Sequence, residues 1–325
     1  MNEWELLRLH DEPCQHFDER LIHRTLMQNI PAFMDLLERF YLAWQQKKSI
    51  VRMPKKTVFT TNGLRGDFRV MPCVIDDFEG MKIKAVKVIG TNEEERVIQD
   101  KIAVGKALII NTTDNHAEGI FDVCALSSFR TAALSVLAFK HLTRADQEII
   151  GMVGIGRIGF YTASILQQWL GRKEVLVYDT DSSRRDVFAG LFAGKMKVTG
   201  VGYNGLLQNA TTVFYATTSS VPLLSADQAG NLEFISSVGA DADNLSELDQ
   251  SLVKGHIIVS ESRQNISFGD LRRWHRAGVL HKESVLELRD MVGRSRPDKP
   301  TIFISTGTAV QDALLCRFLF DLLHH

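Results

Sequence analysis

The stretch from Glu148 to Asp179 reads EIIGMVGIGRIGFYTASILQQWLGRKEVLVYD and decides the fold. An apolar run leads into Gly154-Ile155-Gly156-Arg157-Ile158-Gly159, and a helix-like stretch and a second apolar run follow, ending at Asp179. The glycines let the chain turn tightly and let backbone N–H groups approach a pyrophosphate at a helix N-terminus. Asp179 lies 23 positions after Gly156, where an acid can bind an adenosine ribose. The segment therefore predicts a dinucleotide-binding βαβ unit.

The alternation of strand and helix continues after this unit. The runs VKVTGVG, ATTVFYATTS, LEFISSVGA, HIIVSES and TIFIST read as strands separated by helical or loop segments. This rhythm is typical of a doubly wound parallel sheet. We therefore predict an α/β protein whose residues 127–304 form a Rossmann NAD-binding domain.

The first part of the chain has a different pattern. Apolar residues at helical spacing predict one or two helices over residues 17–46, with Pro31 as a break or first-turn residue. VRMPKKTVF, GDFRVMPCVI and MKIKAVKVIG predict antiparallel strands with a turn at Thr61-Asn62-Gly63, and KALIINTT and GIFDVCAL predict a further strand pair. Residues 1–126, joined by an apolar final helix within 305–325, are thus expected to form a mixed α+β domain for substrate binding and dimerisation.

Composition excludes several classes of function. Lys and Arg total 38 and Asp and Glu total 39, so charge gives no argument for nucleic acid or for a membrane surface. The N-terminus lacks the features of a secretory signal, and no spanning helix is expected. The four scattered cysteines are typical of free thiols in a reducing cytoplasm. The histidines show no metal-ligand spacing, so we predict no metal site.

Segments on both sides of the glycine loop resemble a known family. In chain order they are MPKKTVF, DFRVMP, AVKVIG, SSFRTAALSVLAFKHL, VGIGRIG, SVGADADNLSELD and FISTGTAVQD. This order resembles the ornithine cyclodeaminase/mu-crystallin family, which contains cyclodeaminases, an archaeal-type alanine dehydrogenase, ketimine reductases and opine-type dehydrogenases. The resemblance implies a small α-amino or α-imino acid substrate, NAD as cofactor and a homodimer.

Short matches favour one branch of the family. Lys87-Val88-Ile89-Gly90, residues 127–133 and Ile158-Gly159 are similar to the siderophore-type N-(2-amino-2-carboxyethyl)glutamate dehydrogenases. The leading hypothesis is an NAD-dependent oxidoreductase acting on the α C–N bond of an amino acid or N-substituted, opine-type amino acid through an imine. Two alternatives stay open: ornithine or lysine cyclodeamination with catalytic NAD, and a crystallin-like dinucleotide-binding protein without turnover.

The resemblance implies three cations that bind substrate. Arg130 matches the family's carboxylate-binding arginine, whose guanidinium can hold a carboxylate through two parallel hydrogen bonds. Lys56 falls where many relatives carry an arginine, although Lys55 is adjacent. Arg69 is a further candidate. For each, the alternative is an ordinary surface charge.

Two residues are implied in catalysis. Lys87 matches the family's active-site lysine and, in a closed site, would be a plausible proton carrier; on an exposed strand face it would be a solvated charge. Asp241 matches the catalytic aspartate, which can stabilise an iminium, shuttle a proton or activate water. Asp243 is close enough to be mistaken for it.

The cofactor residues follow from the loop and the resemblance together. Asp179 would repel a 2′-phosphate, which favours NAD over NADP, although Arg184 and Arg185 lie close in sequence. The other expected contacts are Gly154, Gly156, Arg157, Ile158 and Gly159 at the pyrophosphate, Thr217 and Thr218 at the adenosine, Val238 and Gly239 on the nicotinamide side, and Ser305 near the site.

Two departures from the family pattern concern the substrate side. Many relatives carry Pro-Gly-Lys where this chain has Asp243-Asn244-Leu245, so a lysine that would reach the cofactor is absent. Relatives often carry Asp or Lys where this chain has Ile304. The expected dinucleotide site is therefore better defined than the identity of the substrate.

Overall fold

The computed structural model describes residues 2–8, 11–60, 66–91, 103–143, 149–242 and 244–324. Unit 1 comprises Met1–Leu26, Ser49–Leu126 and Ala309–His325, and unit 2 comprises Met27–Lys48 and Ser127–Thr308. Residues 27–48 and 305–308 thus group with unit 2, whereas the sequence pattern placed them in the first domain. The predicted turn at Thr61-Asn62-Gly63 lies outside the described residues.

Unit 1 is built on a seven-stranded sheet within the described residues, in the order β1-β7-β6-β5-β4-β2, with β3 also paired to β4. The long strands β4, β5, β6 and β7 are antiparallel neighbours, as predicted, and the unpredicted β1 is parallel to β7. The bounds are β1 Gln15–Phe17, β2 Val51–Arg52, β3 Thr57–Phe59, β4 Asp67–Phe78, β5 Met81–Thr91, β6 Ala103–Ile110 and β7 Ala117–Asp122, with helices α1 Glu3–Leu7, α2 Glu19–Gln28 and α10 Ala309–Leu323.

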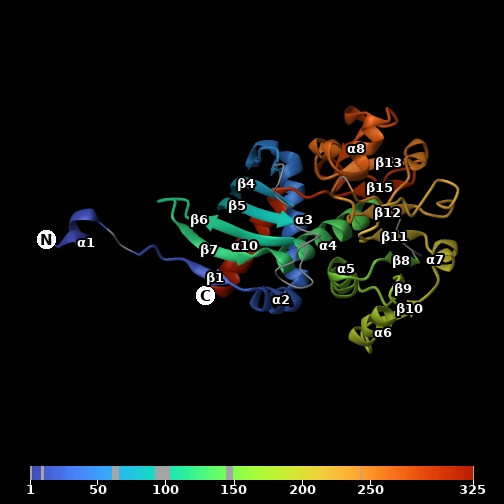
Figure 1. Ribbon diagram of the computed structural model, residues 1–325, viewed down its shortest axis with the longest axis horizontal. Coiled ribbons are helices and arrows are strands. Elements are labelled where there is room, and N and C mark those ends of the chain that lie inside the picture. The colour runs from blue at the N-terminus through green and yellow to red at the C-terminus, as the bar shows by residue number, and fades with distance from the viewer. Residues whose placement is uncertain are drawn as a thin grey trace. The chain divides into compact units, whose positions relative to one another are not determined.

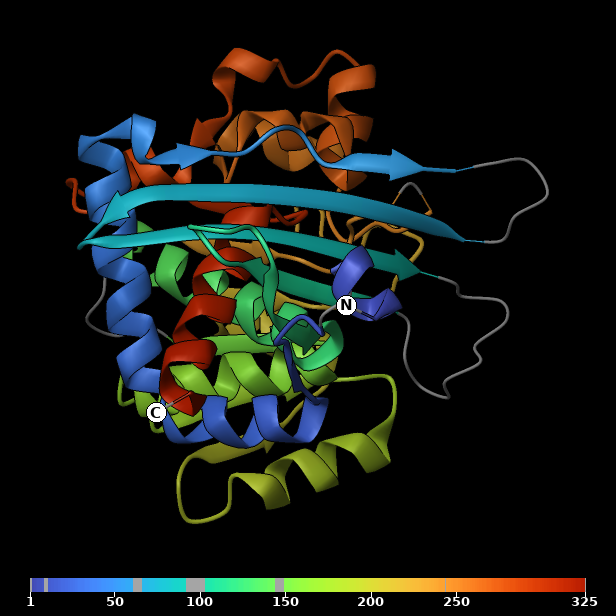
Figure 2. The same cartoon turned by 90° about the vertical axis from the view of Figure 1, so that its left-hand side faces the viewer.

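Helix α10 covers one face of this sheet, where it contacts β4, β5 and β6 (Figure 2). Burial alternates along the middle of β4, where odd-numbered residues such as Met71 and Ile75 are buried and even-numbered ones are half-buried, as Pro72 is, or exposed, as Val74 is. The alternation follows from the two-residue period of a strand. One face of the sheet therefore belongs to the core with α10, and the other carries apolar side chains toward the outside.

Unit 2 contains an eight-stranded parallel sheet in the order β10-β9-β8-β11-β12-β15-β13-β14 (Figure 1). The first five strands follow the order of a Rossmann fold, with β8 at the centre where the winding reverses. The strands are β8 Ile150–Val153, β9 Glu174–Tyr178, β10 Lys197–Gly200, β11 Thr212–Tyr215, β12 Phe234–Ser237, β13 Ile257–Ser260, β14 Leu286–Glu287 and β15 Thr301–Ile304.

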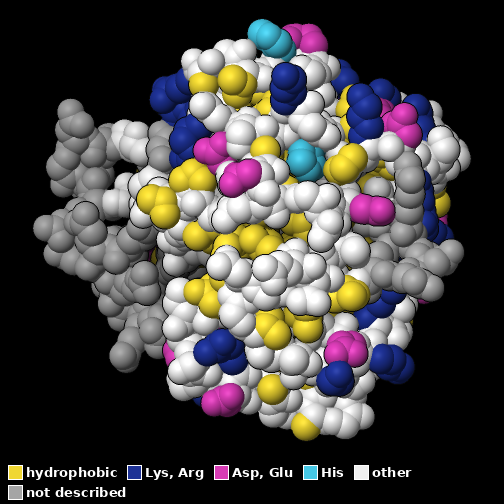
Figure 3. Space-filling model, turned by 90° about the vertical axis from the view of Figure 1, so that its right-hand side faces the viewer, with side chains coloured by type: hydrophobic (Ala, Val, Ile, Leu, Met, Phe, Trp, Pro, Cys, Tyr) yellow, Lys and Arg dark blue, Asp and Glu magenta, His cyan; other side chains and the backbone are white. Residues whose placement is uncertain are grey.

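The helices of unit 2 include α3 Ile30–Gln46, α5 Arg157–Gln168, α6 Ser182–Leu191, α7 Tyr203–Asn209, α8 Gly269–Arg276 and α9 Leu288–Met291, with 3-10 turns at Gln250–Gly255, Arg263–Ser267 and Lys282–Ser284. A further 3-10 turn, Lys48–Ile50, lies at the boundary with unit 1. Pro31 lies in the first turn of α3, as predicted. One buried core contains Val213, Ile235 and Ile302 from the sheet, and Leu206 of α7 and Trp274 of α8 pack in the same core. Lys and Arg are interspersed with Asp and Glu over the face shown in Figure 3.

Helix α4 spans Val123–Leu142, so the prediction that Val123–Leu126 continue a strand was wrong. Strand β7 ends at Asp122, and the apolar residues after it form the first turn of the helix. By length and composition α4 could cross a membrane, which the sequence pattern did not predict, but 83% of its most apolar window is buried, as in the core helix of a folded domain.

The four cysteines differ sharply in their accessibility, which gives a labelling prediction. Burial beside Asp312 raises the pKa of Cys73 to about 12, burial raises that of Cys316, and Cys124 is also buried. Only a thiolate is alkylated, so at about pH 8 iodoacetamide should modify the exposed Cys14 alone, and raising the pH to about 9 should not add Cys73. Intact mass should show a single adduct before unfolding and four after it; further adducts on the folded protein would contradict this burial.

Candidate dinucleotide site and buried charges

The parallel strands of unit 2 end in one row. Val153 pairs with Tyr178 and Tyr215, Tyr215 pairs with Ser237, and Ser237 pairs with Ile304. The residues that follow these ends are Gly154, Asp179, Ala216, Val238 and Ser305. Four of these five were predicted site residues. Ligands of open parallel sheets bind outside this edge, at the point where strand order reverses.

The glycine loop has the shape that a dinucleotide requires. Gly154 has φ +84, and a Cβ on it would lie 2.5 Å from the carbonyl oxygen of Ala216. A Cβ on Gly159 would lie 2.7 Å from the carbonyl oxygen of Gly154, so the start of α5 packs tightly against the loop. A Cβ on Gly156 would meet nothing within 4 Å. Close packing therefore explains why Gly154 and Gly159 carry no side chain. Gly156 instead leaves open space before the N-terminus of α5, where a pyrophosphate fits.

Asp179 closes the loop from the end of β9. Its Oδ2 accepts a hydrogen bond from the backbone N–H of Ile155 (3.1 Å), and its Oδ1 accepts one from that of Asp181 (3.0 Å). The guanidinium of Arg184, on the exposed start of α6, lies 3.6 Å from Oδ2. The carboxylate is thus fixed at the position where a ribose hydroxyl is bound in this fold. Among the other predicted contacts, Arg157 and Thr218 are exposed and Ile158 and Thr217 are half-buried.

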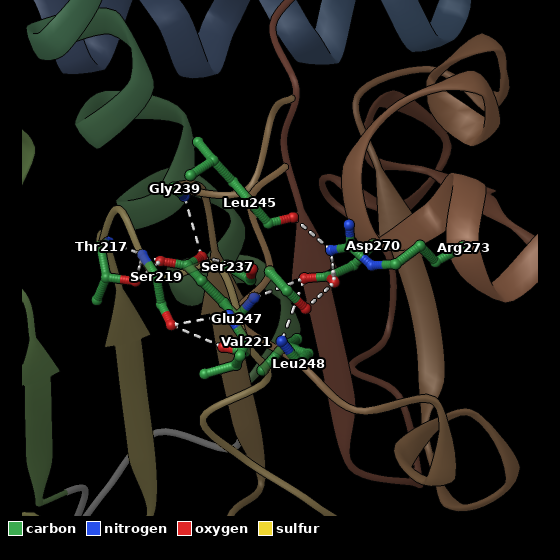
Figure 4. A network of polar contacts seen from close by, with 11 residues as sticks. Thr217, Ser219, Val221, Ser237, Gly239, Leu245, Glu247, Leu248, Asp270 and Arg273 are labelled. Carbon is green, nitrogen blue, oxygen red and sulfur yellow. Dashed lines mark hydrogen bonds and ion pairs between the residues drawn. The ribbon is translucent and has the colours of Figure 1, made fainter. Parts of the chain in front are cut away.

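A buried carboxylate that sequence reasoning missed joins the ends of β11 and β12. Glu247 is 0% exposed, and its Oε1 accepts from the backbone N–H (2.6 Å) and hydroxyl (2.9 Å) of Thr217 (Figure 4). Its Oε2 accepts from the hydroxyl of Ser237 (2.7 Å) and the backbone N–H of Gly239 (3.0 Å). Burial raises the pKa of Glu247, and these hydrogen bonds oppose the rise.

Helix α8 holds the segment that carries Glu247. Asp270 accepts hydrogen bonds from the backbone N–H groups of Glu247 (3.0 Å) and Leu248 (3.1 Å) and from the hydroxyl of Ser246 (2.8 Å) (Figure 4). Gly269 precedes it at φ +53, and a Cβ there would lie 1.9 Å from the carbonyl oxygen of Ala240. The two residues before the half-buried Asp241 are therefore held in place, Gly239 by Glu247 and Ala240 by Gly269; Asp243 lies outside the described residues.

Arg130 is 7% exposed, so it is not a surface charge. Its Nη2 donates to the hydroxyl of Ser127 (3.1 Å). A Cβ on Gly307 would lie 2.8 Å from that Nη2 and 3.3 Å from Cζ, so the guanidinium packs against the Gly307 backbone. Glu261, also missed from sequence, accepts from the N–H of Gly307 (2.6 Å) and the hydroxyl of Ser305 (3.0 Å) and fixes this loop.

In unit 1, Lys87 is buried (1% exposed), which excludes the solvated-face interpretation. Its Nζ lies 2.5 Å from Oδ2 of Asp312 on α10, a carboxylate that is itself 3% exposed. Arg69 is on the same inner face, since Met71 pairs with Lys87 and Arg69 with Ile89. Arg69 is buried and donates to Asp67 (3.1 Å), while Lys56 is half-buried and Lys55 exposed.

The parallel sheet, its strand order and the glycine loop define a Rossmann-type α/β protein. The chain belongs to the ornithine cyclodeaminase/mu-crystallin family, whose sequence profile matches residues 21–325. It is 23% identical to the ketimine reductase mu-crystallin of Rattus norvegicus over 274 residues, covering 83% of this chain and 85% of that protein.

Two solved structures share the fold. One is the Δ1-pyrroline-2-carboxylate reductase of Thermococcus litoralis in complex with NADH and L-proline, with TM-score 0.81, 21% identity and coverage of 96% of this chain and 98% of that chain. The other is an archaeal alanine dehydrogenase dimer with bound NAD, with TM-score 0.81, 19% identity and coverage of 95% of each chain.

Proposed function

We propose that this protein is an NAD-dependent oxidoreductase that interconverts an α-amino acid and the corresponding α-imino acid. The observation that carries the proposal is the closure of the glycine loop by Asp179, with open space at Gly156 before α5. Family membership supports the reaction class, because the relatives named above are a ketimine reductase, a pyrroline-carboxylate reductase and an alanine dehydrogenase.

The residues of unit 2 supply dinucleotide binding and substrate orientation. The glycine loop and Asp179 would hold NAD, which would supply the acceptor for a hydride from the substrate α-carbon while the nitrogen loses a proton and the C=N bond forms. The buried guanidinium of Arg130 presents a fork of donors that suits an α-carboxylate. Asp241, which follows the held residues Gly239 and Ala240, can take the proton from nitrogen or activate the water that hydrolyses the imine to a 2-oxo acid and an amine.

Unit 1 contains the remaining candidate cations, with Lys87 and Arg69 on the inner face of its sheet and Lys56 just before β3. Lys87 is paired with Asp312 and acts as proton carrier or carboxylate contact, and Arg69 and Lys56 contribute positive charge to substrate binding. The finer proposal is an N-substituted, opine-type amino acid, which rests on the short matches at Lys87–Gly90 and Ile158-Gly159. Free thiols at the buried cysteines suit a reducing cytoplasm.

The test is a spectrophotometric screen of α-amino acids and opine-type secondary amines with NAD, repeated in reverse with 2-oxo acids, amines and NADH. We expect NADH to appear with at least one substrate and to depend on Arg130. Ammonia release with no net NADH would support cyclodeamination instead. NADH binding without turnover over the whole panel would overturn the proposed activity.

We further propose a homodimer formed through the outer face of the unit 1 sheet. α10 covers the inner face, whereas the outer face exposes Val74, Val88 and Val104 together with the stacked pair Phe59 and Phe68, whose ring centroids are 4.7 Å apart. Contiguous apolar surface of this kind marks an association site. The related archaeal alanine dehydrogenase is a dimer.

Phe68→Asp tests the homodimer, because Phe68 lies opposite Phe59 and Gly90 on this face, where a charge buried in the interface would meet an aromatic ring. Light scattering should give the dimer mass for the native chain and the monomer mass for Phe68→Asp. Val187→Asp is the matched control, since Val187 is exposed on α6 of unit 2 and should leave the mass unchanged. A native chain that is monomeric at all concentrations would contradict the proposal.

A further inference from the structure

The sheet edge of unit 2 contains a buried acid with an unusual set of donors. Each oxygen of Glu247 accepts one backbone N–H, from Thr217 at Oε1 and from Gly239 at Oε2. Each also accepts one hydroxyl, from Thr217 and Ser237. Because a backbone N–H can only donate, both oxygens must stay acceptors.

These contacts leave no room for a side chain at Gly239. A Cβ on Gly239 would lie 2.0 Å from the carbonyl oxygen of Thr217 and 2.4 Å from Oε1 of Glu247. The loops after β11 and β12 are therefore in direct backbone contact. The carboxylate of Glu247 joins them by accepting from the N–H of Thr217 and the N–H of Gly239. Asp270 in turn fixes the backbone of Glu247 and Leu248.

We propose that Glu247 is a positioning residue that holds the loops after β11 and β12 in the shape that receives the dinucleotide. It also sets the start of the turn bearing Asp241, two residues after Gly239. The inference rests on the proposed dinucleotide binding and adds to it a residue that touches neither substrate nor cofactor. It acts through Thr217 and Gly239, which do border the expected cofactor position.

Glu247→Gln is the sharpest test, because the change keeps size and burial. Whichever way the amide is turned, its NH2 group faces either the N–H of Thr217 or that of Gly239, so one donor loses its acceptor and meets another donor. We expect the Kd of NADH, measured by fluorescence titration of the full chain, to rise about tenfold or more. The KM of Glu247→Gln for NAD should rise in parallel, measured with the substrate on which the wild-type protein is active.

Glu287→Gln is the matched control. Glu287 is also a buried glutamate of unit 2, accepting from the N–H of Arg263 (2.9 Å) and pairing with Arg289, but it ends the edge strand β14. One amide oxygen can still accept from Arg263. This variant should lose some resistance to urea while keeping the wild-type Kd for NADH.

The outcomes separate the inference from the function on which it rests. Failure of the wild type to bind NADH would refute the proposed function. Wild-type binding with an unchanged Kd in a folded Glu247→Gln would refute the positioning role. If Glu247→Gln does not fold, Ser237→Ala removes only one hydroxyl contact, and we expect it to raise the Kd about threefold; no change there would equally refute the role.

Discussion

Arg130→Lys is expected to lower kcat/KM for the amino or imino acid about 100-fold while leaving the Kd of NADH unchanged. Lysine preserves the charge but not the planar fork of donors that grips both carboxylate oxygens. Hydrogen bonds between charged groups are worth about 1.5–3 kcal/mol, and a loss of this size corresponds to about 10–150-fold in rate. Steady-state kinetics on the substrate found in the screen, with NADH titration beside it, checks both statements.

Gly307→Ala offers an independent approach to the same guanidinium. The new methyl would lie 2.8 Å from Nη2 of Arg130, and the backbone at φ +84 disfavours any side chain. The guanidinium must move, so the kinetic loss should resemble that of Arg130→Lys in sign, again with the Kd of NADH preserved. The control is Arg263→Lys, where the guanidinium binds the carbonyl oxygen of Val285 (2.8 Å) instead. If Arg130→Lys had the same kcat/KM as the wild type, the proposed role of Arg130 in substrate binding would be refuted.

The glycine loop shows why so much of the fold could be predicted from sequence. The turn chemistry at Gly154 and Gly159, the apolar runs and the acid at Asp179 are local features, separated by at most one helix. Local spacing therefore predicted the dinucleotide-binding unit and the parallel sheet. The first turn of α4 was assigned wrongly because Val123–Leu126 are apolar and follow β7 directly, so the polarity pattern does not change where the helix begins after Asp122.

The supporting carboxylates could not be predicted in the same way. Glu247 reaches Thr217 across 30 positions, and Glu261 reaches Gly307 across 46. Asp312 lies 225 positions after Lys87 (312 − 87). Asp312 ends FISTGTAVQD, one of the segments that resemble the family, but the sequence did not show that it pairs with Lys87. Such partners depend on which strand ends and helices fold back together. The family resemblance could identify Lys87 as chemically interesting, but only the fold shows that Asp312 neutralises its charge.

The pair of Lys87 and Asp312 gives the largest expected effect on stability. Both side chains are almost fully buried, with Nζ and Oδ2 2.5 Å apart. Removing one partner of a buried ion pair leaves an uncompensated charge and costs about 3–5 kcal/mol, a large share of a total near 5–15 kcal/mol. Asp312→Ala and Lys87→Met should each lower the free energy of unfolding by this amount, measured with urea. Lys254→Met, at an exposed lysine of unit 2, should change it by less than about 0.5 kcal/mol.

The double variant Lys87→Met/Asp312→Leu separates the structural role of the pair from its chemical role. Two apolar side chains of similar volume remove both charges together, so most of the stability lost by the single variants should return. Turnover should not return, because the proton carrier is gone, and a loss of about 100-fold or more in kcat is expected. A double variant as unstable as the single ones would show that the two charges do not compensate each other. A stable double variant with wild-type kcat would show that Lys87 only supports the fold.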